Sequence, residues 1–253
     1  MTLISVQLRS QALQKCVGVK ILLADAAAPP YPTYYLLHGL SDNETVWTRQ
    51  TSLERHASAY PFLIIMPDGG RSFYTDSPLG AYETFIAKEL VAWIDRIFPT
   101  RQQRRYRAIG GLSMGGYGAM RLGWRWPATF GVVAAHSAAA DFGHVRDSQH
   151  YERIPEAKLI FDHCPPETID LWQLSASCPR RLRPKLYFDC GRRDRLLPGN
   201  QHLHRHLLSL GYRHVYRLYT GQHDWAYWDE HIQDALAFVA QVMRIKLCVA
   251  CRS

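Results

Sequence analysis

The chain has 253 residues, of which 47% are hydrophobic and 21% are charged, with a formal net charge of +8. This composition excludes an intrinsically disordered chain. No apolar run approaches the ~18–20 residues of a membrane span, so we expect no membrane partner. An α/β chain of this length usually forms one domain, and we predict a single domain over residues 1–253.

Short apolar runs alternate with longer segments of helical period, which predicts a mostly parallel sheet of about eight strands with helices on both faces. Several runs are almost wholly apolar, as is typical of strands that are covered on both sides. The first two runs are expected to form an antiparallel pair at one edge of the sheet. The predicted strands are Leu3–Leu8, Val17–Leu23, Thr33–Leu37, Phe62–Met66, Tyr106–Ile109, Gly131–Ala135, Lys185–Asp189 and His214–Tyr219.

Between these runs, two segments carry a clear apolar stripe at helical spacing. In the first, residues 81–98, the stripe comprises Phe85, Ile86, Leu90, Trp93, Ile94 and Ile97. In the second, residues 230–245, it comprises Ile232, Ala235, Leu236, Val239, Val242 and Met243. A shorter helix is predicted over Asn200–Leu210, ended by Gly211.

Residues 140–184 interrupt this alternation. The stretch is polar and shows no apolar period of its own, so we interpret it as an excursion over the end of the sheet. We expect it to form a lid or a pocket wall and not a second domain.

The sequence Gly111-Leu112-Ser113-Met114-Gly115 matches G-x-S-x-G between a predicted strand and a predicted helix. A serine at such a sharp bend adopts a strained backbone, and side chains two positions away on either side would collide with it. Glycine is therefore needed at positions 111 and 115. The alternative is a glycine-rich packing turn of a dinucleotide fold, but those turns follow the first strand with different spacing. We predict that Ser113 is a nucleophile.

A serine nucleophile needs a base and an acid that orients the base, and in this type of fold they follow in the order acid, then histidine. Asp194 lies just past the seventh predicted strand, whereas Asp189 lies inside that strand and is the alternative, interpreted as structural. His223 lies just past the eighth strand, and Asp224 beside it is expected to cap the following helix. The remaining histidines are less well placed, and we expect His202, His204, His206 and His231 to be exposed.

Two backbone N–H groups are expected to bind the oxyanion of the reaction: that of Met114, after the nucleophile, and that of Leu40, in the loop after the third strand. His38 in the same loop is interpreted as a packing and hydrogen-bonding residue. Candidate pocket residues lie close to these motifs, with a place in the core as the alternative for each. They are Trp47, Phe73, Tyr74, Trp225 and Trp228.

Two basic segments, residues 100–107 and 179–185, could indicate a nucleic-acid surface. Neither has interleaved aromatic residues, so we interpret both as solvated connections and expect no nucleic-acid partner. The six cysteines show no regular spacing, and Cys248-x-x-Cys251 alone does not predict a metal or redox site. The amino-terminal sequence has no basic region followed by an apolar core, and we expect a cytoplasmic protein.

Together the stretches "YYLLHGLSDNETVW", "IMPDGGRSFYTDS", "GLSMGGYGAM", "DCGRRDRLLPGN" and "GQHDWAYW" resemble the esterase D-type esterases, nearest to the tributyrin esterase and acetyl esterase branch. S-formylglutathione hydrolases, feruloyl esterases and mycolyltransferases are relatives on the same scaffold. The resemblance runs from about Leu3 to Met243. It implies an α/β-hydrolase fold, no metal or organic cofactor, and hydrolysis of short-chain acyl esters. It places the triad on Ser113, Asp194 and His223 and the oxyanion hole on Leu40 and Met114.

The expected function is therefore a serine carboxylesterase acting on small acetyl to butyryl esters. The alternatives are a thioester hydrolase of the S-formylglutathione type, an acyltransferase, and a binding protein on a hydrolase scaffold that has lost activity. The sequence leaves the natural ester and the oligomeric state open, including a homo-oligomer.

Overall fold

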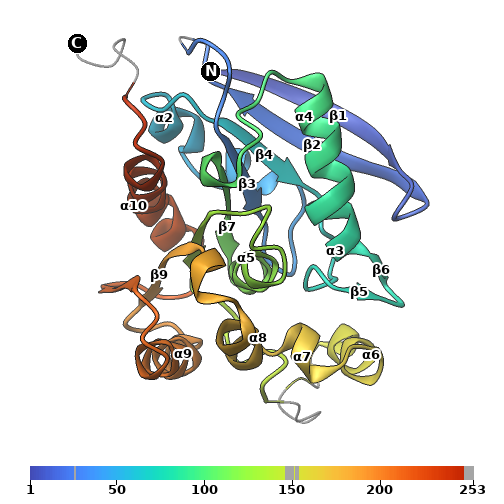
Figure 1. The fold of residues 1–253 in the computed structure, drawn as a ribbon, viewed down its shortest axis with the longest axis vertical. Helices are drawn as coiled ribbons and strands as arrows, with labels where there is room; N and C mark the ends of the chain where they lie inside the picture. Colours follow the sequence, from blue (N-terminus) through green and yellow to red (C-terminus); the bar gives the residue numbers. More distant parts are fainter. Residues whose placement is uncertain (26, 146–150, 152–153, 248–253) are drawn as a thin grey trace.

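The computed structural model describes residues 1–25, 27–145, 151 and 154–247. Its centre is an eight-stranded sheet with the strand order β1-β2-β4-β3-β7-β8-β9-β10 (Figure 1). The six strands from β4 to β10 run parallel, while β2 is antiparallel to both β1 and β4. The eight strands are β1 (Thr2–Ser10), β2 (Lys15–Leu23), β3 (Thr33–Leu37), β4 (Leu63–Pro67), β7 (Arg107–Leu112), β8 (Val132–His136), β9 (Lys185–Gly191) and β10 (His214–Tyr219).

The eight strands predicted from the apolar runs are all present, each within a few residues of its expected bounds. The antiparallel edge pair is also confirmed. A further short hairpin, which no apolar run predicted, lies outside the sheet and consists of β5 (Asp76–Ser77) and β6 (Gly80–Ala81).

Helices cover both faces of the sheet, and each face has its own apolar cluster. One face is covered by α3 (Tyr82–Thr84), the π-helical turn η1 (Phe85–Leu90), α4 (Val91–Ile97), α5 (Met114–Arg125), α6 (Pro155–His163), α7 (Pro166–Ile169), α8 (Leu171–Ser177) and α9 (Leu197–Ser209). The other is covered by α1 (Val46–Gln50), α2 (Leu53–Ala57) and α10 (Trp225–Met243). Two 3₁₀ turns, η2 (Arg104–Tyr106) and η3 (Arg180–Leu182), precede β7 and β9.

The helix predicted over residues 81–98 is continuous through α3, η1 and α4, but one residue of its stripe is misplaced. Phe85, Ile86 and Ile94 are buried as expected, whereas Ile97 is 52% exposed. The wider i→i+5 turn of η1 changes the phase of the helix, so that Ile97, at the end of α4, falls outside the stripe expected for a regular α-helix.

The described part of the excursion over residues 140–184 contains more helix than its sequence indicated. It contains α6, α7 and α8, and α8 packs against α5. Its apolar residues join the cluster on the α5 face. The buried ones include Phe142, Ile160, Phe161, Ile169 and Leu171. The excursion showed no helical period of its own in the sequence, because its helices are only 9, 4 and 7 residues long.

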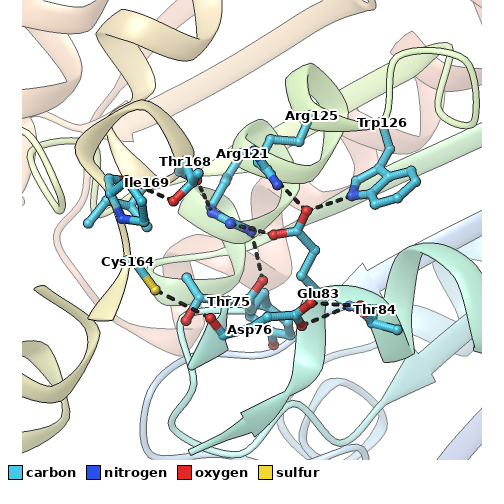
Figure 2. A network of polar contacts seen from close by, with 12 residues as sticks. Thr75, Asp76, Glu83, Thr84, Arg121, Arg125, Trp126, Cys164, Thr168 and Ile169 are labelled. Carbon is cyan, nitrogen blue, oxygen red and sulfur yellow. Dashed lines mark hydrogen bonds and ion pairs between the residues drawn. The ribbon is translucent and has the colours of Figure 1, made fainter. Parts of the chain in front are cut away.

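A buried ion pair ties the excursion to the rest of the molecule (Figure 2). Arg121, on α5, donates to the Glu83 carboxylate and also to the backbone carbonyl of Thr168. The other oxygen of Glu83 accepts from Arg125 at 2.7 Å and from Trp126 at 2.8 Å. Burial alone would raise the pKa of the Glu83 carboxyl, but the two guanidinium groups outweigh burial and hold that pKa below its usual value.

Removing Arg121 should destabilise the protein strongly. Arg121→Met leaves the Glu83 carboxylate buried with only Arg125 as its charge partner, and we expect a loss of about 3–5 kcal/mol in the free energy of unfolding. Urea unfolding measures it. Lys158→Met is the control, because Lys158 pairs with Asp162 on the exposed face of α6 and should matter by less than about 1 kcal/mol. Equal effects of the two substitutions would contradict the buried network.

Candidate active site

Ser113 occupies a strained bend between β7 and α5. Its φ of 54° and ψ of −115° lie in a region that residues with a side chain rarely adopt. The bend is fixed on both sides of the residue: its N–H donates to the His136 carbonyl, and its carbonyl accepts from the N–H groups of Tyr117 and Ala139. The hydroxyl therefore stands at the amino end of α5, at the carboxyl edge of the sheet.

The glycines on either side of Ser113 allow the backbones of β7 and α5 to lie close to the backbone at the end of β3. A Cβ at Gly111 would lie 2.6 Å from the Leu37 carbonyl oxygen, and one at Gly115 would lie 2.6 Å from the carbonyl oxygens of Leu37 and His38. Such distances do not occur for real side chains. The clearance expected for positions 111 and 115 is therefore present.

His223 and Asp194 form a continuous hydrogen-bonded chain with Ser113. The Nε2 atom of His223 lies 3.1 Å from the Ser113 Oγ, and its Nδ1 lies 3.1 and 3.0 Å from the two Asp194 carboxylate oxygens. These residues follow β7, β9 and β10 at the same edge of the sheet. Asp194 is buried, and the side chain of His223 is 15% exposed. Trp228 lies edge-to-face against the His223 ring, with centroids 4.9 Å apart.

The Asp194 carboxyl is favoured in its charged form. Burial by itself would raise its pKa, but hydrogen bonds from His223, from Ser137 and from the Leu196 N–H hold the pKa below its usual value of 3.8. A charged Asp194 fixes the His223 ring with Nδ1–H toward the carboxylate, and Nε2 then faces Ser113 as an acceptor.

Asp189 belongs to a second buried hydrogen-bond network, which joins β8, β9 and α10. Its carboxylate accepts from His136 Nδ1 at 2.7 Å and from the Tyr227 hydroxyl at 2.8 Å, and its carbonyl accepts from the Ser137 N–H. Asp189 and His136 are fully buried. The sequence indicated a structural role for Asp189, but its partners were not found, because both come from other strands or helices.

The loop after β3 lies against the serine. A Cβ at Gly39 would be 3.9 Å from the Ser113 Cβ. The Gly39 carbonyl accepts from His38 Nδ1 at 2.7 Å and from the Asp42 N–H at 3.3 Å. The Nε2 atom of His38 accepts from the Gly69 N–H at 2.8 Å, so the ring links the Gly39 carbonyl to the backbone at Gly69. His38 is therefore the buried hydrogen-bonding residue that the sequence predicted.

The five aromatic candidates are distributed between the core and the site. Phe73 and Tyr74 lie in the core on the α5 side, where Phe73 stacks on Phe142 with centroids 3.6 Å apart. Trp47 is also fully buried and donates from its indole N–H to the Leu37 carbonyl. For these three residues the structure favours the core alternative.

Trp225 is half-buried between Trp47 and Trp228, at centroid distances of 5.7 and 5.1 Å. Through Trp228 this aromatic group reaches the His223 ring. Trp225 therefore lies nearer to solvent than the other four candidates, whereas the buried Trp228 is the candidate in direct contact with His223.

The excursion reaches the loop after β3 through an ion pair. Arg71 makes two hydrogen bonds to the Glu156 carboxylate of α6, at 2.5 and 3.0 Å, and a longer one to the Leu40 carbonyl at 3.4 Å. Nothing in the local sequence around residue 71 indicated this contact, because Glu156 is 85 residues away.

The histidine predictions outside the site need correction. His231 is buried: its ring stacks on Tyr219 and contacts Tyr227. His204 and His206 are half-buried, with hydrogen bonds to His214 at 2.7 Å and to the Trp172 carbonyl at 3.1 Å, whereas His202 is exposed as expected. Neighbours from β10 and α8 cover these rings, which the spacing within one helix does not show. Asp224 caps α10 as predicted, accepting from the Tyr227 N–H.

In the basic segments, Arg104 donates to the carbonyls of Pro127 and Leu182, and Arg183 donates to that of Leu210. Arg107 pairs with Asp95. The segments were interpreted as solvated connections, but these arginines bind other parts of the protein, and Arg107 is buried. Cys248 and Cys251 lie outside the described residues.

Known proteins that are similar in sequence identify the family to which the chain belongs. The profile of the family described as "Putative esterase" matches residues 10–239. The chain belongs to this esterase family. The acetyl esterase of Caldicellulosiruptor saccharolyticus is 30% identical over 222 residues, which cover 83% of this chain and 84% of that protein. The resemblance found in the sequence motifs is thus confirmed.

Solved structures of similar proteins also support membership of a serine hydrolase family. The fluorophosphonate-binding serine hydrolase FphF of Staphylococcus aureus superposes with a TM-score of 0.85 at 27% identity, covering 94% of this chain and 98% of that one. The S-formylglutathione hydrolase FrmB of the same species gives 0.81 at 26% identity with the same coverage. The fold is the predicted α/β-hydrolase fold, and this family member is a carboxylic ester hydrolase of the serine type that acts on small esters. Within the described residues no helix is long and apolar enough to cross a membrane.

The depressed pKa of Asp194 predicts how its contribution to stability varies with pH. A carboxyl whose folded-state pKa lies below its unfolded value, near ~3.9, stabilises the fold above that value. This contribution is lost as the pH falls through the folded-state pKa. We expect the difference in free energy of unfolding between wild type and Asp194→Asn to be largest above about pH 5 and to shrink below about pH 4.

Urea unfolding at several pH values measures this difference. Asp162→Asn, on the exposed face of α6, is the control and should show a small difference throughout. A difference for Asp194→Asn that stays constant down to about pH 3 would contradict the direction of the pKa shift.

Proposed function

We propose that the protein is a serine carboxylesterase that hydrolyses short-chain acyl esters, acetyl to butyryl, through Ser113, His223 and Asp194. The observation that carries this proposal is the unbroken hydrogen-bonded chain from the Ser113 Oγ through His223 to Asp194, placed at a strained strand-to-helix bend. Such a bend holds the hydroxyl away from its own sheet and at the positive end of a helix.

In the proposed reaction, the Ser113 Oγ attacks the ester carbonyl carbon while His223 Nε2 takes the hydroxyl proton. Asp194 stabilises the resulting imidazolium through Nδ1–H. The tetrahedral intermediate collapses when His223 gives the proton to the leaving alkoxide, which departs as the alcohol. A water molecule then attacks the acyl-enzyme with His223 as base, and the carboxylic acid and free Ser113 are regenerated.

The developing oxyanion is proposed to accept hydrogen bonds from the N–H groups of Met114 and Leu40. Met114 is the first residue of α5, where N–H groups have no partner within the helix. The Gly39 carbonyl is held by His38 and Asp42, and in a planar trans peptide the Leu40 N–H points the opposite way. Each such donor is typically worth about 3–4 kcal/mol of transition-state stabilisation.

The choice of short acyl groups is supported by the acetyl esterase of C. saccharolyticus, which matches most of this chain. A second candidate is thioester hydrolysis, because the similar S. aureus structure is an S-formylglutathione hydrolase. Comparing kcat/KM for S-formylglutathione and for p-nitrophenyl acetate separates the two. Product analysis with competing alcohols or thiols tests the remaining alternative, acyl transfer.

Ser113 should react stoichiometrically with a fluorophosphonate, and Ser113→Ala should not react. Asp194→Asn should keep Ser113 but lose about 10⁴-fold in kcat, because the histidine is no longer held in its productive tautomer. Intact-mass spectrometry and peptide mapping identify the labelled residue. Ser209→Ala, at the exposed end of α9, is the control and should label like wild type.

Wild-type protein that stays unlabelled at every pH from about 6 to 9 would refute the serine hydrolase mechanism. That result would favour the binding-protein alternative.

Among p-nitrophenyl esters, those with acetyl to butyryl groups should give the highest kcat/KM. Initial rates across a series from acetyl to dodecanoyl measure the preference. An optimum at octanoyl or longer groups would contradict the proposed substrate class while leaving the nucleophile assignment intact.

A further inference from the structure

Two consecutive residues near the site have a strained backbone. Phe73 and Tyr74, in the loop after β4, have φ angles of +49° and +56°, although neither is glycine. A non-glycine residue in this left-handed region typically costs about 1–3 kcal/mol, and such residues concentrate at functional sites. Both side chains are buried, and neither takes part in the proposed reaction steps. The strain therefore needs a reason other than contact with substrate.

Several hydrogen bonds hold this strained turn in place. The Ser72 hydroxyl donates to the Gly69 carbonyl and accepts from the Tyr74 N–H. Arg121 donates to the Tyr74 carbonyl at 3.0 Å, so the buried ion pair of Figure 2 also fixes this turn to α5. The position of Tyr74 is thus determined from both sides of its backbone.

The Tyr74 ring lies between two glycines. A Cβ at Gly69 would collide with the Cε1 atom of the ring, and a Cβ at Gly118 would collide with its Cδ2 atom. Gly118 belongs to α5, the helix that begins at Met114. The ring is therefore in direct contact with the helix that carries one of the two proposed oxyanion donors.

The Tyr74 hydroxyl reaches the loop that carries the other donor. It donates to the His38 carbonyl at 2.9 Å, and that carbonyl also lies against Gly115 of α5. The ring of His38 in turn holds the Gly39 carbonyl, which sets the orientation of the Gly39–Leu40 peptide. One tyrosine thus connects the first turns of α5 to the backbone that presents the Leu40 N–H.

We propose that Tyr74 is a positioning residue that sets the spacing between the Met114 and Leu40 N–H groups, so that both point at one oxyanion. This inference rests on the proposed esterase function. The strained turn is what allows the Tyr74 ring to enter between Gly69 and Gly118 with its hydroxyl at the His38 carbonyl. Tyr74 does not touch the substrate and acts through the backbone of His38 and Gly39.

A positioning role at the oxyanion hole has a specific kinetic signature. Loss of the Tyr74 hydroxyl should weaken a hydrogen bond that forms fully only in the transition state, so kcat should fall with KM nearly unchanged. The effect should depend on the substrate atom that becomes the anion. A thionoester carries sulfur there, a larger and weaker hydrogen-bond acceptor than oxygen, and should gain less from well-placed donors.

The test compares Tyr74→Phe with Tyr34→Phe. Tyr34 is equally buried, lies in β3, and its hydroxyl has no hydrogen-bond partner within the described part of the chain. For each protein, kcat/KM is measured for an acetyl ester and for the matching thionoester. Rates are normalised to the Ser113 that a fluorophosphonate titrates, so misfolded protein does not contribute.

We expect Tyr74→Phe to lower kcat/KM for the ester about 10- to 100-fold, a part of the 10²–10³-fold effect of losing a whole donor. The thionoester rate should fall less than about 3-fold, and the pH profile should keep its shape because the triad is unchanged. We define the oxygen-to-sulfur ratio as kcat/KM for the ester divided by kcat/KM for the thionoester. Tyr34→Phe should leave this ratio at the wild-type value.

If Tyr74→Phe yields no titratable Ser113, Ser72→Ala is measured in the same way, since it removes the hydroxyl that accepts from the Tyr74 N–H. An oxygen-to-sulfur ratio equal to wild type in the variant measured would overturn the role of Tyr74. Wild-type protein that neither titrates nor hydrolyses the ester would instead overturn the proposed function, so the two failures are distinguishable.

Discussion

The close approach of α5 to the carboxyl edge of the sheet governs the geometry of the site. At Gly111 and Gly115 the backbone of this helix and of its preceding strand lies against the carbonyls of Leu37 and His38, with no room for a Cβ. This contact forces the positive φ of Ser113 and brings the amino end of α5 next to the loop after β3. A larger residue at either glycine would move α5 away from the loop after β3. Ser113 would then no longer lie against that loop.

Two buried polar networks then support the site from opposite faces of the sheet. On the α10 side, Asp189 ties β9 to His136 and Tyr227, close to the segments that carry Asp194 and His223. On the α5 side, Arg121 links Glu83, Tyr74 and the excursion. Since unpaired buried charges are costly, each network keeps its loops in one arrangement. The hydrogen-bonded chain of Ser113, His223 and Asp194, proposed to be catalytic, comes from three loops and depends on that rigidity.

Most of the fold was predictable from local pattern. The strands were found from apolar runs bounded by polar turns, and the bend at Ser113 from glycine spacing, because both features depend on residues close in sequence. The helices of the excursion were not predicted, since at 9, 4 and 7 residues they are too short to show a helical period. His231 was expected to be exposed because the ring that covers it, Tyr219, comes from a different element.

The sequence by itself determined the family, the order of the strands along the chain, and the three residues that meet as Ser113, His223 and Asp194. It could do so because parallel strands deliver the loops that follow them to one edge of the sheet. Only the tertiary structure decided that Tyr74 and Phe73 are buried behind the site, that Asp189 joins His136, and that Arg71 meets Glu156. These contacts join segments far apart in the sequence, and their geometry depends on how helices pack across the sheet, which no local pattern specifies.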